Sequence, residues 1–422
     1  MGKISKLFYE EIVIGTGPSA MGYLTGIKTG ISKSKSKSKR SILLITRNTV
    51  NDKKFRQHPK LCKNFHCIVD TKRTLGLNVP GSTSAHGGLS NAWGGVLVEL
   101  SVNAIEQSYK CNNTDANQIK NYYTEIVHEI KKDREVDEFI FNTGSEKTHV
   151  IKGCKDYGWE NGGLSITSTI DRLADELDVK IQSGLIVDSI FKINKDFKWM
   201  LKGVINNEVV TLYCNYLVLA AGVVSNISLY HNKESIPDIL DHSPYQIACL
   251  SFSSAINNNT KTPIVNISKD DQYIAVEYRI NKLSKAFLTN FYGAEKGLFV
   301  YYLSHIFPIS MWQIWTESTN VVISDKNRKG DASKFGWRNI IKIFLRVVKL
   351  KALPLYIIKT KEGEGFHYIS PDFISKEIGL SVDKDESIVI LGGAAMRDLP
   401  VHHPSLTFMA HAAWIGAKYA KN

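Results

Sequence analysis

A short apolar strand that runs directly into a glycine-rich turn constrains the fold of this chain more than any other feature. Glu11-Ile12-Val13-Ile14 has the apolar, β-branched character of a buried parallel strand. The next six residues form a G-x-G-x-x-A pattern from Gly15 to Ala20, and the chain can continue from there as a helix. We therefore predict a strand–turn–helix unit of the dinucleotide-binding type, with a plain glycine turn as the alternative.

Each small residue of this turn has a physical role in that interpretation. Gly15 permits the tight turn, Gly17 lets the backbone approach a pyrophosphate, and Ala20 allows helix and strand to pack closely. The helix N-terminus offers free N–H groups and a partial positive charge to phosphates. The predicted phosphate-binding residues are Gly15, Gly17, Pro18, Ser19 and Ala20.

The second strand departs from the usual pattern. Ser41 to Ile45 reads as a strand, but Thr46-Arg47 stands where a ribose-binding acid is expected. Arg47 could accept a 2′-phosphate, which would favour NADP, or it could be solvated while Thr46 or the backbone holds the ribose. The Ser-Lys run from Ser32 to Arg40 precedes this strand; we interpret it as a surface insertion or, alternatively, as a contact for anionic lipid or polymer.

Two further stretches of small residues indicate close approach to a flat ligand. The segment from Gly87 to Gly95 packs four glycines around Ser, Asn and Trp, which is costly in chain entropy unless the backbone must lie against a ligand; a tight Ω-loop is the alternative. The segment from Tyr216 to Gly222 reads as a buried strand that ends in small residues, after a hairpin turn at Asn206-Asn207. The predicted ligand contacts are Gly87, Gly88, Ser90, Asn91, Trp93, Gly94, Ala220, Ala221 and Gly222.

The C-terminal segment predicts a last strand and a buried helix. Glu386 to Leu391 reads as a strand, and Gly392-Gly393 as a turn. An apolar helix is expected from about Leu406 to Lys418, buried on most faces because it carries almost no charge. Pro404 suits its first turn.

In these patches the chain resembles the glucose–methanol–choline oxidoreductases, especially the shorter bacterial members associated with sugar and surface-polysaccharide chemistry. The N-terminal glycine loop is similar to their FAD pyrophosphate loop, and Gly87 to Gly95 to their G-G-x-S-x-x-W-G-G flavin loop. Ala220-Ala221-Gly222 resembles their second flavin-domain signature, and Asp241-His242 the pair at which the chain enters the substrate domain.

The resemblance also implies two catalytic residues. Gly365-Phe366-His367-Tyr368 is similar to the segment that carries the first catalytic histidine, and the segment from His403 to Thr407 to the one that carries the second catalytic His or Asn. These histidines lie 36 residues apart, and Pro404 and Leu406 are expected beside the cofactor. Covalent flavin attachment in some relatives uses a His where this chain has Ala92, so FAD should be non-covalent.

The implied fold is α/β. A discontinuous Rossmann-like FAD-binding domain would take residues 1–110, 160–240 and 366–422. A sheet-containing α+β substrate domain would take residues 241–365, with residues 111–159 as an intervening segment.

The implied reaction is oxidation of a CH–OH group of a sugar or polyol, in surface polysaccharide biosynthesis. Hydride would move to flavin N5 while His367 or His403 serves as base and the other orients the carbinol, because imidazole has an ordinary pKa of about 6.5. The N-terminus of the last helix would stabilise reduced flavin.

Departures from the family pattern keep two alternatives open. The family's Asp near the final strand is Gly392 or Gly393 here, and Tyr368-Ile369-Ser370-Pro371 replaces a glycine-rich continuation. An NADP-linked flavoprotein reductase and a catalytically degenerate flavin-binding protein are those alternatives. The substrate's identity, the electron acceptor and the oligomeric state are not specified by the sequence.

Composition narrows the class of protein and its partners. With 43% hydrophobic and 22% charged residues in 422, the chain is neither collagenous, disordered nor a disulfide-stapled miniprotein. Its net charge of +12 favours anionic partners. We do not expect nucleic acid to be one of them. Six scattered cysteines, no secretory leader and no long apolar run indicate a cytoplasmic protein. The spacing of His58, Cys62, His66 and Cys67 indicates a metal site only weakly, so no metal is expected.

A basic amphipathic segment indicates weak peripheral contact with an anionic membrane surface. Between Trp337 and Lys349, one helical stripe is basic and the opposite face apolar. The alternative is an ordinary helix that packs its apolar side on the core. Together with the aromatic stretch from Phe299 to Trp315, this would suit a lipid-linked sugar as substrate. The basic stripe consists of Arg338, Lys342, Arg346 and Lys349, and the apolar face of Trp337, Ile340, Ile341, Phe344, Leu345 and Val348.

Overall fold

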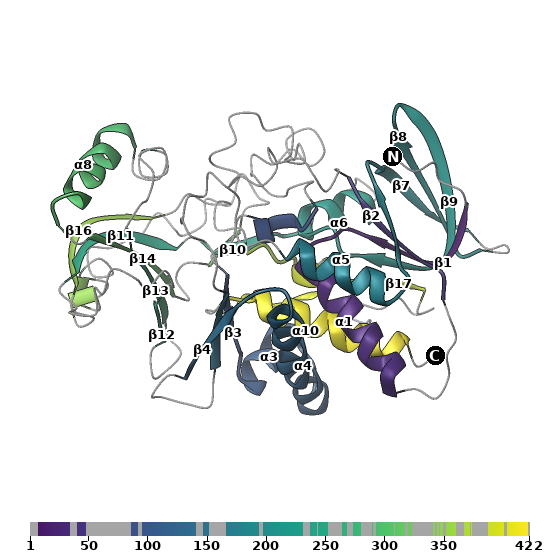
Figure 1. Ribbon diagram of the computed structural model, residues 1–422, viewed down its shortest axis with the longest axis horizontal. Helices are drawn as coiled ribbons and strands as arrows, with labels where there is room; N and C mark the ends of the chain where they lie inside the picture. Colours follow the sequence, from purple (N-terminus) through teal and green to yellow (C-terminus); the bar gives the residue numbers. More distant parts are fainter. Residues whose placement is uncertain are drawn as a thin grey trace.

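The computed structural model places two sheets at opposite ends of an elongated molecule (Figure 1). It describes residues 7–33, 40–47, 86–91, 95–140, 147–151, 166–193, 197–230, 237–242, 244–251, 264–267, 273–279, 289, 293–307, 309–316, 320–322, 341, 344–345, 347–348, 352–359, 367–371, 373, 387–400 and 403–420.

The first sheet contains the predicted nucleotide-binding strand. Its strand order is β6-β2-β1-β9-β8-β7, and β17 also pairs with β9. The parallel strands of this sheet are β6, β2, β1, β9 and β17. Strands β9, β8 and β7 form an antiparallel meander. The strands are β1 (Phe8–Ile14), β2 (Ile42–Thr46), β6 (Lys180–Ser183), β7 (Ile186–Lys192), β8 (Trp199–Ile205), β9 (Glu208–Leu219) and β17 (Ile388–Ile390).

Local sequence accounts for the turns of this sheet. Asn206 and Asn207 close the β8–β9 hairpin with φ angles of 52° and 66°, as a two-residue turn of left-handed residues requires. The buried β-branched run of β1 lies between β2 and β9, so it is covered by a strand on both sides.

Two helices from the opposite ends of the chain pack against each other beside this sheet. They are α1 (Pro18–Lys33) and α10 (Ser405–Tyr419), coloured purple and yellow in Figure 1. Gly22 and Gly26 lie on one face of α1, and a Cβ atom at either would overlap the carbonyl oxygen of Met409 or Ala413. Gly416 of α10 makes the reciprocal approach to the Tyr23 carbonyl. The two backbones therefore touch, which buries the C-terminal helix as predicted.

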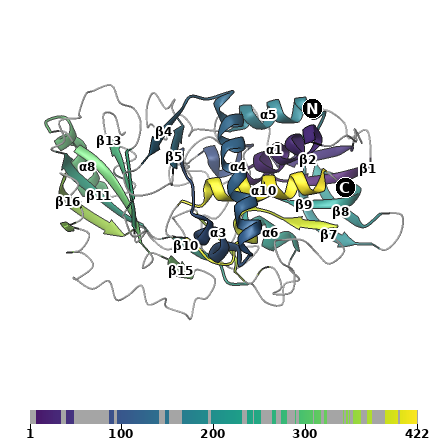
Figure 2. The same cartoon turned by 90° about the horizontal axis from the view of Figure 1, so that it is seen from below.

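Other helices complete the layer. Figure 2 shows α10 between α1 and α4. The helices are α3 (Val102–Tyr109), α4 (Asn113–Lys131), α5 (Thr167–Glu176) and α6 (Val223–Tyr230), with 3-10 turns η3 (Gly88–Asn91) and η7 (Gly392–Ala395). A small sheet is formed by β3 (Val96–Val98), β4 (Val136–Ile140) and β5 (Lys147–Ile151).

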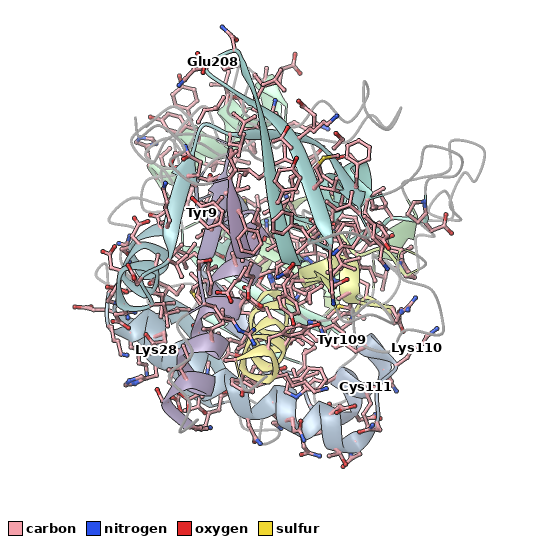
Figure 3. The ribbon with its side chains drawn as sticks, turned by 90° about the vertical axis from the view of Figure 1, so that its right-hand side faces the viewer. Tyr9, Lys28, Tyr109, Lys110, Cys111 and Glu208 are labelled. Atoms are coloured by element: carbon pink, nitrogen blue, oxygen red, sulfur yellow. The ribbon has the colours of Figure 1, made fainter. Side chains whose placement is uncertain are left out.

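A cluster of charges joins three of these helices. Glu129 of α4 accepts hydrogen bonds from Lys28 of α1, labelled in Figure 3, from Lys132, and from Arg172 of α5. Burial raises the pKa of Glu129, but these hydrogen bonds outweigh it and hold the pKa at about 2. The carboxylate therefore stays ionised and paired at neutral pH.

The second sheet is antiparallel, in the order β12-β13-β14-β11-β16, and β10 pairs separately with β15. One face of it packs into its own core, around Tyr245, Ile247, Trp312, Ile314 and Val347. The elements of this region are β10 (Leu240–His242), β11 (Tyr245–Ser251), β12 (Ile264–Ile267), β13 (Tyr273–Arg279), α8 (Ala294–Ser304), β14 (Ile309–Thr316), β15 (Asn320–Val322) and β16 (Ala352–Lys359).

The predicted fold class is confirmed, because a Rossmann-like parallel sheet and a second, sheet-containing region are both present. The residue limits given above for the two domains stay a prediction. One local expectation was wrong: Gly392-Gly393 begins a 3-10 helix rather than a simple turn. Among the described residues, no helix is long and apolar enough to cross a membrane.

Candidate functional site

The N-terminal glycine turn and the small residues that end the Tyr216–Gly222 segment meet at the carboxyl ends of β1 and β9. Gly15 has a φ of +111°, and a Cβ there would overlap the Ala220 carbonyl group. The amide of Ala220 donates to the Ile14 carbonyl oxygen at 2.8 Å. Gly15 therefore makes the tight turn that the sequence predicts, and it must be glycine because of both its φ and its close neighbour.

The start of the Gly87–Gly95 segment lies against the N-terminal glycine turn. The Gly87 amide donates to the Thr16 carbonyl oxygen at 2.9 Å, and an added Cβ on Gly88 would be 3.0 Å from the Gly17 Cα. Ser90 Oγ donates to the Gly87 carbonyl oxygen at 2.6 Å, which holds the turn. Three residues of this loop, Ala92, Trp93 and Gly94, lie outside the described residues, and the structure describes only the backbone of Asn91.

The glycines at the edge of this cluster face space of the kind a ligand could fill. An added Cβ on Gly17 would meet nothing closer than the Gly88 Cα at 3.9 Å, and one on Gly222 would meet nothing within 4 Å. Helix α1 begins at Pro18, and the amides of its first turn have no acceptor within the helix. This cradle therefore fits an anionic dinucleotide, whose phosphates such amides bind.

The predicted phosphate-site residue Ala20 and the two residues at the ribose-binding position, Thr46 and Arg47, differ in burial. Ala20 is fully buried, in keeping with close packing of helix and sheet. At the end of β2, Thr46 is buried and Arg47 is exposed.

The two predicted catalytic histidines come together. The ring centroids of His367 and His403 are 4.6 Å apart, with an interplanar angle of 81°. His242, at the end of β10, lies edge-on to His367 at 5.5 Å, and Trp315 of β14 lies edge-on to His403 at 4.3 Å. Two imidazoles from separate segments therefore share one site, next to side chains from the second sheet.

The backbone around His367 is held from two sides. Its amide donates to Oδ1 of the buried Asp241 at 2.9 Å, and Ile369 exchanges two 3.0 Å backbone hydrogen bonds with Leu240. On the other side, a Cβ at Gly393 would overlap the Tyr368 carbonyl oxygen. The chain after His367 occupies the space in which a side chain at 393 would lie. The glycine at 393 and the Tyr368–Pro371 sequence, the two departures noted above, therefore account for each other.

A continuous run of contacts joins these histidines to the glycine cradle. An added Cβ on Gly392 would be 2.5 Å from Ser19 Oγ, at the start of α1. The next residue, Gly393, touches Tyr368, which follows His367. The imidazole pair is thus tied to the helix N-terminus through two adjacent glycines.

Burial fixes the charge state of the His367 ring. Burial of the ring lowers its pKa to about 4, so the imidazole is neutral at pH 7. Its Nδ1 is buried and has no hydrogen-bond partner among the described residues. A neutral imidazole with a vacant nitrogen can accept a proton from a hydroxyl group that reaches it.

Sequence reasoning missed a polar row on the second sheet. Gln246 of β11 lies directly opposite Gln313 of β14, and Trp315 follows two residues later on the same face. The Gln246 Oε1 and Trp315 Nε1 atoms are buried without a hydrogen-bond partner in the described part of the chain. Because Trp315 touches His403, this face is the one turned toward the histidines. The available signal was a glutamine within the strongly apolar run of β14.

Two predicted cofactor neighbours sit at the start of the last helix. Pro404 occupies the N-cap position of α10, and Leu406 is fully buried in the core. The weak metal motif at His58, Cys62, His66 and Cys67 lies outside the described residues. Within the described ranges, no group of three or more metal-ligating side chains occurs.

Comparison with solved structures gives the fold. Pyridoxine 4-oxidase from Mesorbium loti aligns over 98% of this chain and 99% of its own, with a TM-score of 0.54 and 7% sequence identity. At that identity the likeness shows the shared fold.

Two other alignments are weaker. The myxobacterial chondrochloren halogenase, described as FAD-dependent, aligns over 97% of this chain and 73% of its own at 11% identity and a TM-score of 0.39. A flavoprotein/dehydrogenase from Cytophaga hutchinsonii aligns over 98% and 78% at 10% identity and a TM-score of 0.41. No protein-family model and no curated protein sequence matches the chain.

Proposed function

We propose that this protein is an FAD-dependent oxidoreductase that oxidises a CH–OH group of a sugar or polyol. The observation that carries the proposal is the meeting of His367 and His403 at 4.6 Å, joined through Gly393 and Gly392 to the glycine cradle at the start of α1. The fold shared with pyridoxine 4-oxidase, an oxidase by name, supports a redox role.

The residues that would hold FAD are those of the cradle. Gly17, Ser19 and the first-turn amides of α1 would bind the pyrophosphate, and the open side of Gly222 would admit the flat ring system. When bound, FAD would supply the acceptor for the hydride that leaves the carbinol carbon.

The histidines would handle the proton and the orientation of the substrate. His367 is neutral at pH 7 and has a vacant, buried Nδ1, so we assign it as the base that takes the hydroxyl proton. His403 would hydrogen-bond the same oxygen and fix the carbinol, while Trp315 limits the tilt of its ring. The Asp241 carboxylate keeps the His367 backbone in place and is a positioning residue.

The polar row on the second sheet supports a polyhydroxylated substrate. Gln246, Gln313 and Trp315 present amide and indole groups on the face that meets His403. Buried polar groups of this kind raise the free energy of the protein when they stay unpaired. A ligand with several hydroxyls would therefore satisfy them, and a simple alcohol would not. A lipid-linked sugar, with a role in surface polysaccharide synthesis, is the specific substrate that we propose within this class.

The decisive experiment is flavin reduction. The purified protein should be yellow or become so with FAD, and an alcohol substrate from a panel of free, nucleotide-linked and lipid-linked sugars should bleach it without oxygen. His403→Ala and His367→Ala should keep the flavin spectrum but slow bleaching by about 10²- to 10⁴-fold, the usual range for a lost acid–base group. Unchanged bleaching in both variants would refute the assignment.

The same experiment separates the alternatives. Bleaching by NADPH alone would identify a flavoprotein reductase, to which the exposed Arg47 could contribute a 2′-phosphate contact. A protein that cannot be loaded with FAD would be a degenerate member of the fold.

The substrate class has its own matched test. Gln246→Met and Trp315→Phe should raise KM for a polyol about tenfold, the size of one or two lost hydrogen bonds, with little change in kcat. Trp312→Phe is the control, because that indole lies on the opposite face of β14 and donates to Ser310 Oγ. An equal effect of Trp312→Phe and Trp315→Phe would mean that the sheet, not the polar row, was disturbed.

A further inference from the structure

Helix α8 carries apolar side chains on its solvent side. Phe299 and Tyr302 are three residues apart, so they lie on one side of the helical axis, and Ile306 lies in the turn that follows the helix. Their exposed fractions are 63%, 60% and 74%, whereas Gly297 and Val300 are buried. The helix therefore buries Gly297 and Val300 and presents the aromatic rings of Phe299 and Tyr302 to solvent, the reverse of an ordinary surface helix.

A second segment shows the same inversion. Ile341, Phe344, Leu345 and Val348 are exposed, and Val347 alone of the described residues in this segment is buried against the second sheet. These four side chains belong to the apolar face predicted from the sequence. For these four residues the alternative in which the apolar face packs on the core is wrong, because Val347 makes the contact with the second sheet instead.

Both segments lie at the end of the molecule remote from α1 and α10 (Figure 1). We call their exposed apolar residues the distal surface, which consists of Phe299, Tyr302, Ile306, Phe307, Ile341, Phe344, Leu345, Val348 and Leu353. Scattered exposed apolar residues are normal, but many at one end of a molecule mark a site of interaction.

The composition of the chain segment that carries Ile341 to Val348 points to the partner. Residues 326–351 contain nine Lys and Arg and only one acidic residue, Asp331. On α8, the first turn holds Glu295 and Lys296, and the Lys296 ammonium donates to the Tyr356 hydroxyl at 2.6 Å. Aromatic and aliphatic side chains interleaved with cations are the composition of helices that lie in the headgroup region of anionic bilayers.

We propose that the distal surface binds the surface of an anionic lipid bilayer. A second copy of the chain is disfavoured as the occupant, because two chains of net charge +12 would repel each other. The inference depends on exposure and charge and not on the proposed chemistry, so either can fail while the other stands. If both hold, the second sheet would lie near the membrane that carries a lipid-linked substrate.

The test is flotation of the full-length protein with vesicles. Vesicles of phosphatidylcholine with about one-third phosphatidylglycerol should carry the wild type upward at low salt, and pure phosphatidylcholine or about 0.5 M NaCl should weaken this, as screening requires. Phe299→Glu combined with Ile306→Glu, and separately Phe344→Glu with Leu345→Glu, should each lower the partition coefficient at least about tenfold. Both variants should keep their folded circular dichroism spectrum, because the replaced side chains are exposed.

Val209→Glu is the matched control. Val209 is 77% exposed but lies in the β8–β9 hairpin of the first sheet, so it is compared with the single variants Phe299→Glu and Phe344→Glu, which add the same one negative charge to the distal surface. It should float like the wild type. Equal losses for Val209→Glu and the distal variants would show a net-charge effect only, which overturns the proposal.

Two other outcomes also overturn it. Wild-type protein that stays at the bottom with anionic vesicles at low salt does not bind lipid. A dimer in sedimentation velocity that the distal substitutions dissociate, without any flotation, assigns the surface to a second copy of the chain.

Discussion

The two sheets of this protein bury their residues by different means. The first sheet shares one large core with α1, α4 and α10, and glycines allow backbones from both ends of the chain to touch. In the described part of the chain, the second sheet packs a separate, smaller core on one face, while its other face carries polar side chains toward His403 and its helices expose apolar ones. The first region is built for tight packing, and we propose that the second presents surfaces to a substrate and to a bilayer.

The contrast corresponds to different requirements of a cofactor site and of a substrate or membrane site. A cofactor site needs a backbone held rigidly, since amides and glycines do the binding and cannot adjust independently. A substrate or membrane site needs side chains that stay unsatisfied until the partner arrives. The following predictions challenge that contrast, beginning with the largest expected effect.

Gly26→Ala should be the most damaging small change. In an exposed helix this substitution stabilises by about 1 kcal/mol, but here the new Cβ would overlap the Ala413 carbonyl oxygen and force α1 away from α10. We expect the free energy of unfolding in urea to fall by about 3 kcal/mol or more. Ser32→Ala, on an exposed part of α1, should change it by less than about 0.5 kcal/mol. A stabilising effect of Gly26→Ala would show that the helices do not touch.

Hydrogen exchange should separate the two sheets. Amides of β1 and β9, in the large core, should exchange at least about a hundredfold more slowly than those of β11 and β14, because fewer of the described residues are buried around the second sheet. Mass spectrometry of peptides from each strand measures this directly. Equal protection in both sheets would indicate a single cooperative unit and remove the contrast.

His411 should make the first region sensitive to acid. This fully buried residue of α10 stacks on Tyr109 at 4.3 Å, and burial, with a smaller contribution from Lys418, lowers its pKa to about 3. Below pH 6.5 the unfolded chain gains a proton at this site that the folded chain does not, so stability is complete above pH 6.5 and is lost as the pH falls.

His411→Phe should abolish this part of the pH dependence. Between pH 7 and pH 5 the wild type should lose about 2 kcal/mol through this residue, and the variant should lose that much less. Urea unfolding at the two pH values gives the difference. An identical loss in wild type and variant would mean that the folded protein can protonate His411.

Gly17→Ala should have the smallest effect on stability and a selective effect on ligand binding. A Cβ there meets no atom within 3.9 Å, so the melting temperature should stay the same. The methyl group would occupy space intended for the pyrophosphate, and FAD affinity measured by fluorescence quenching should fall about tenfold, or about 1.4 kcal/mol. An unchanged affinity would place the cofactor elsewhere.

Several parts of the site could be predicted because their signals are local. The turn at Gly15 needs a positive φ, the hairpin at Asn206-Asn207 needs two left-handed residues, and the uncharged run after Pro404 needs burial. Each requirement is met within a few residues of chain. The proximity of His367 and His403 was expected only through family resemblance, since nothing in their local sequences requires it.

Other parts depend on contacts between distant segments. Gly393 is explained by the Tyr368 carbonyl, which occupies its side-chain space, and the roles of Gln246 and Trp315 depend on which face of β14 meets His403. A one-residue change of register would turn that face away.

By itself, then, the sequence determined the elements whose backbone geometry is set by neighbouring residues: the glycine turn, the first strand, the hairpin and the last helix. Tertiary structure alone decided the backbone contact between α1 and α10, the polar row beside the histidines, and the exposure of the distal surface. The physical reason is that the first group depends on the allowed φ and ψ angles of a few residues. The second group depends on which surfaces meet, a choice made by the whole fold.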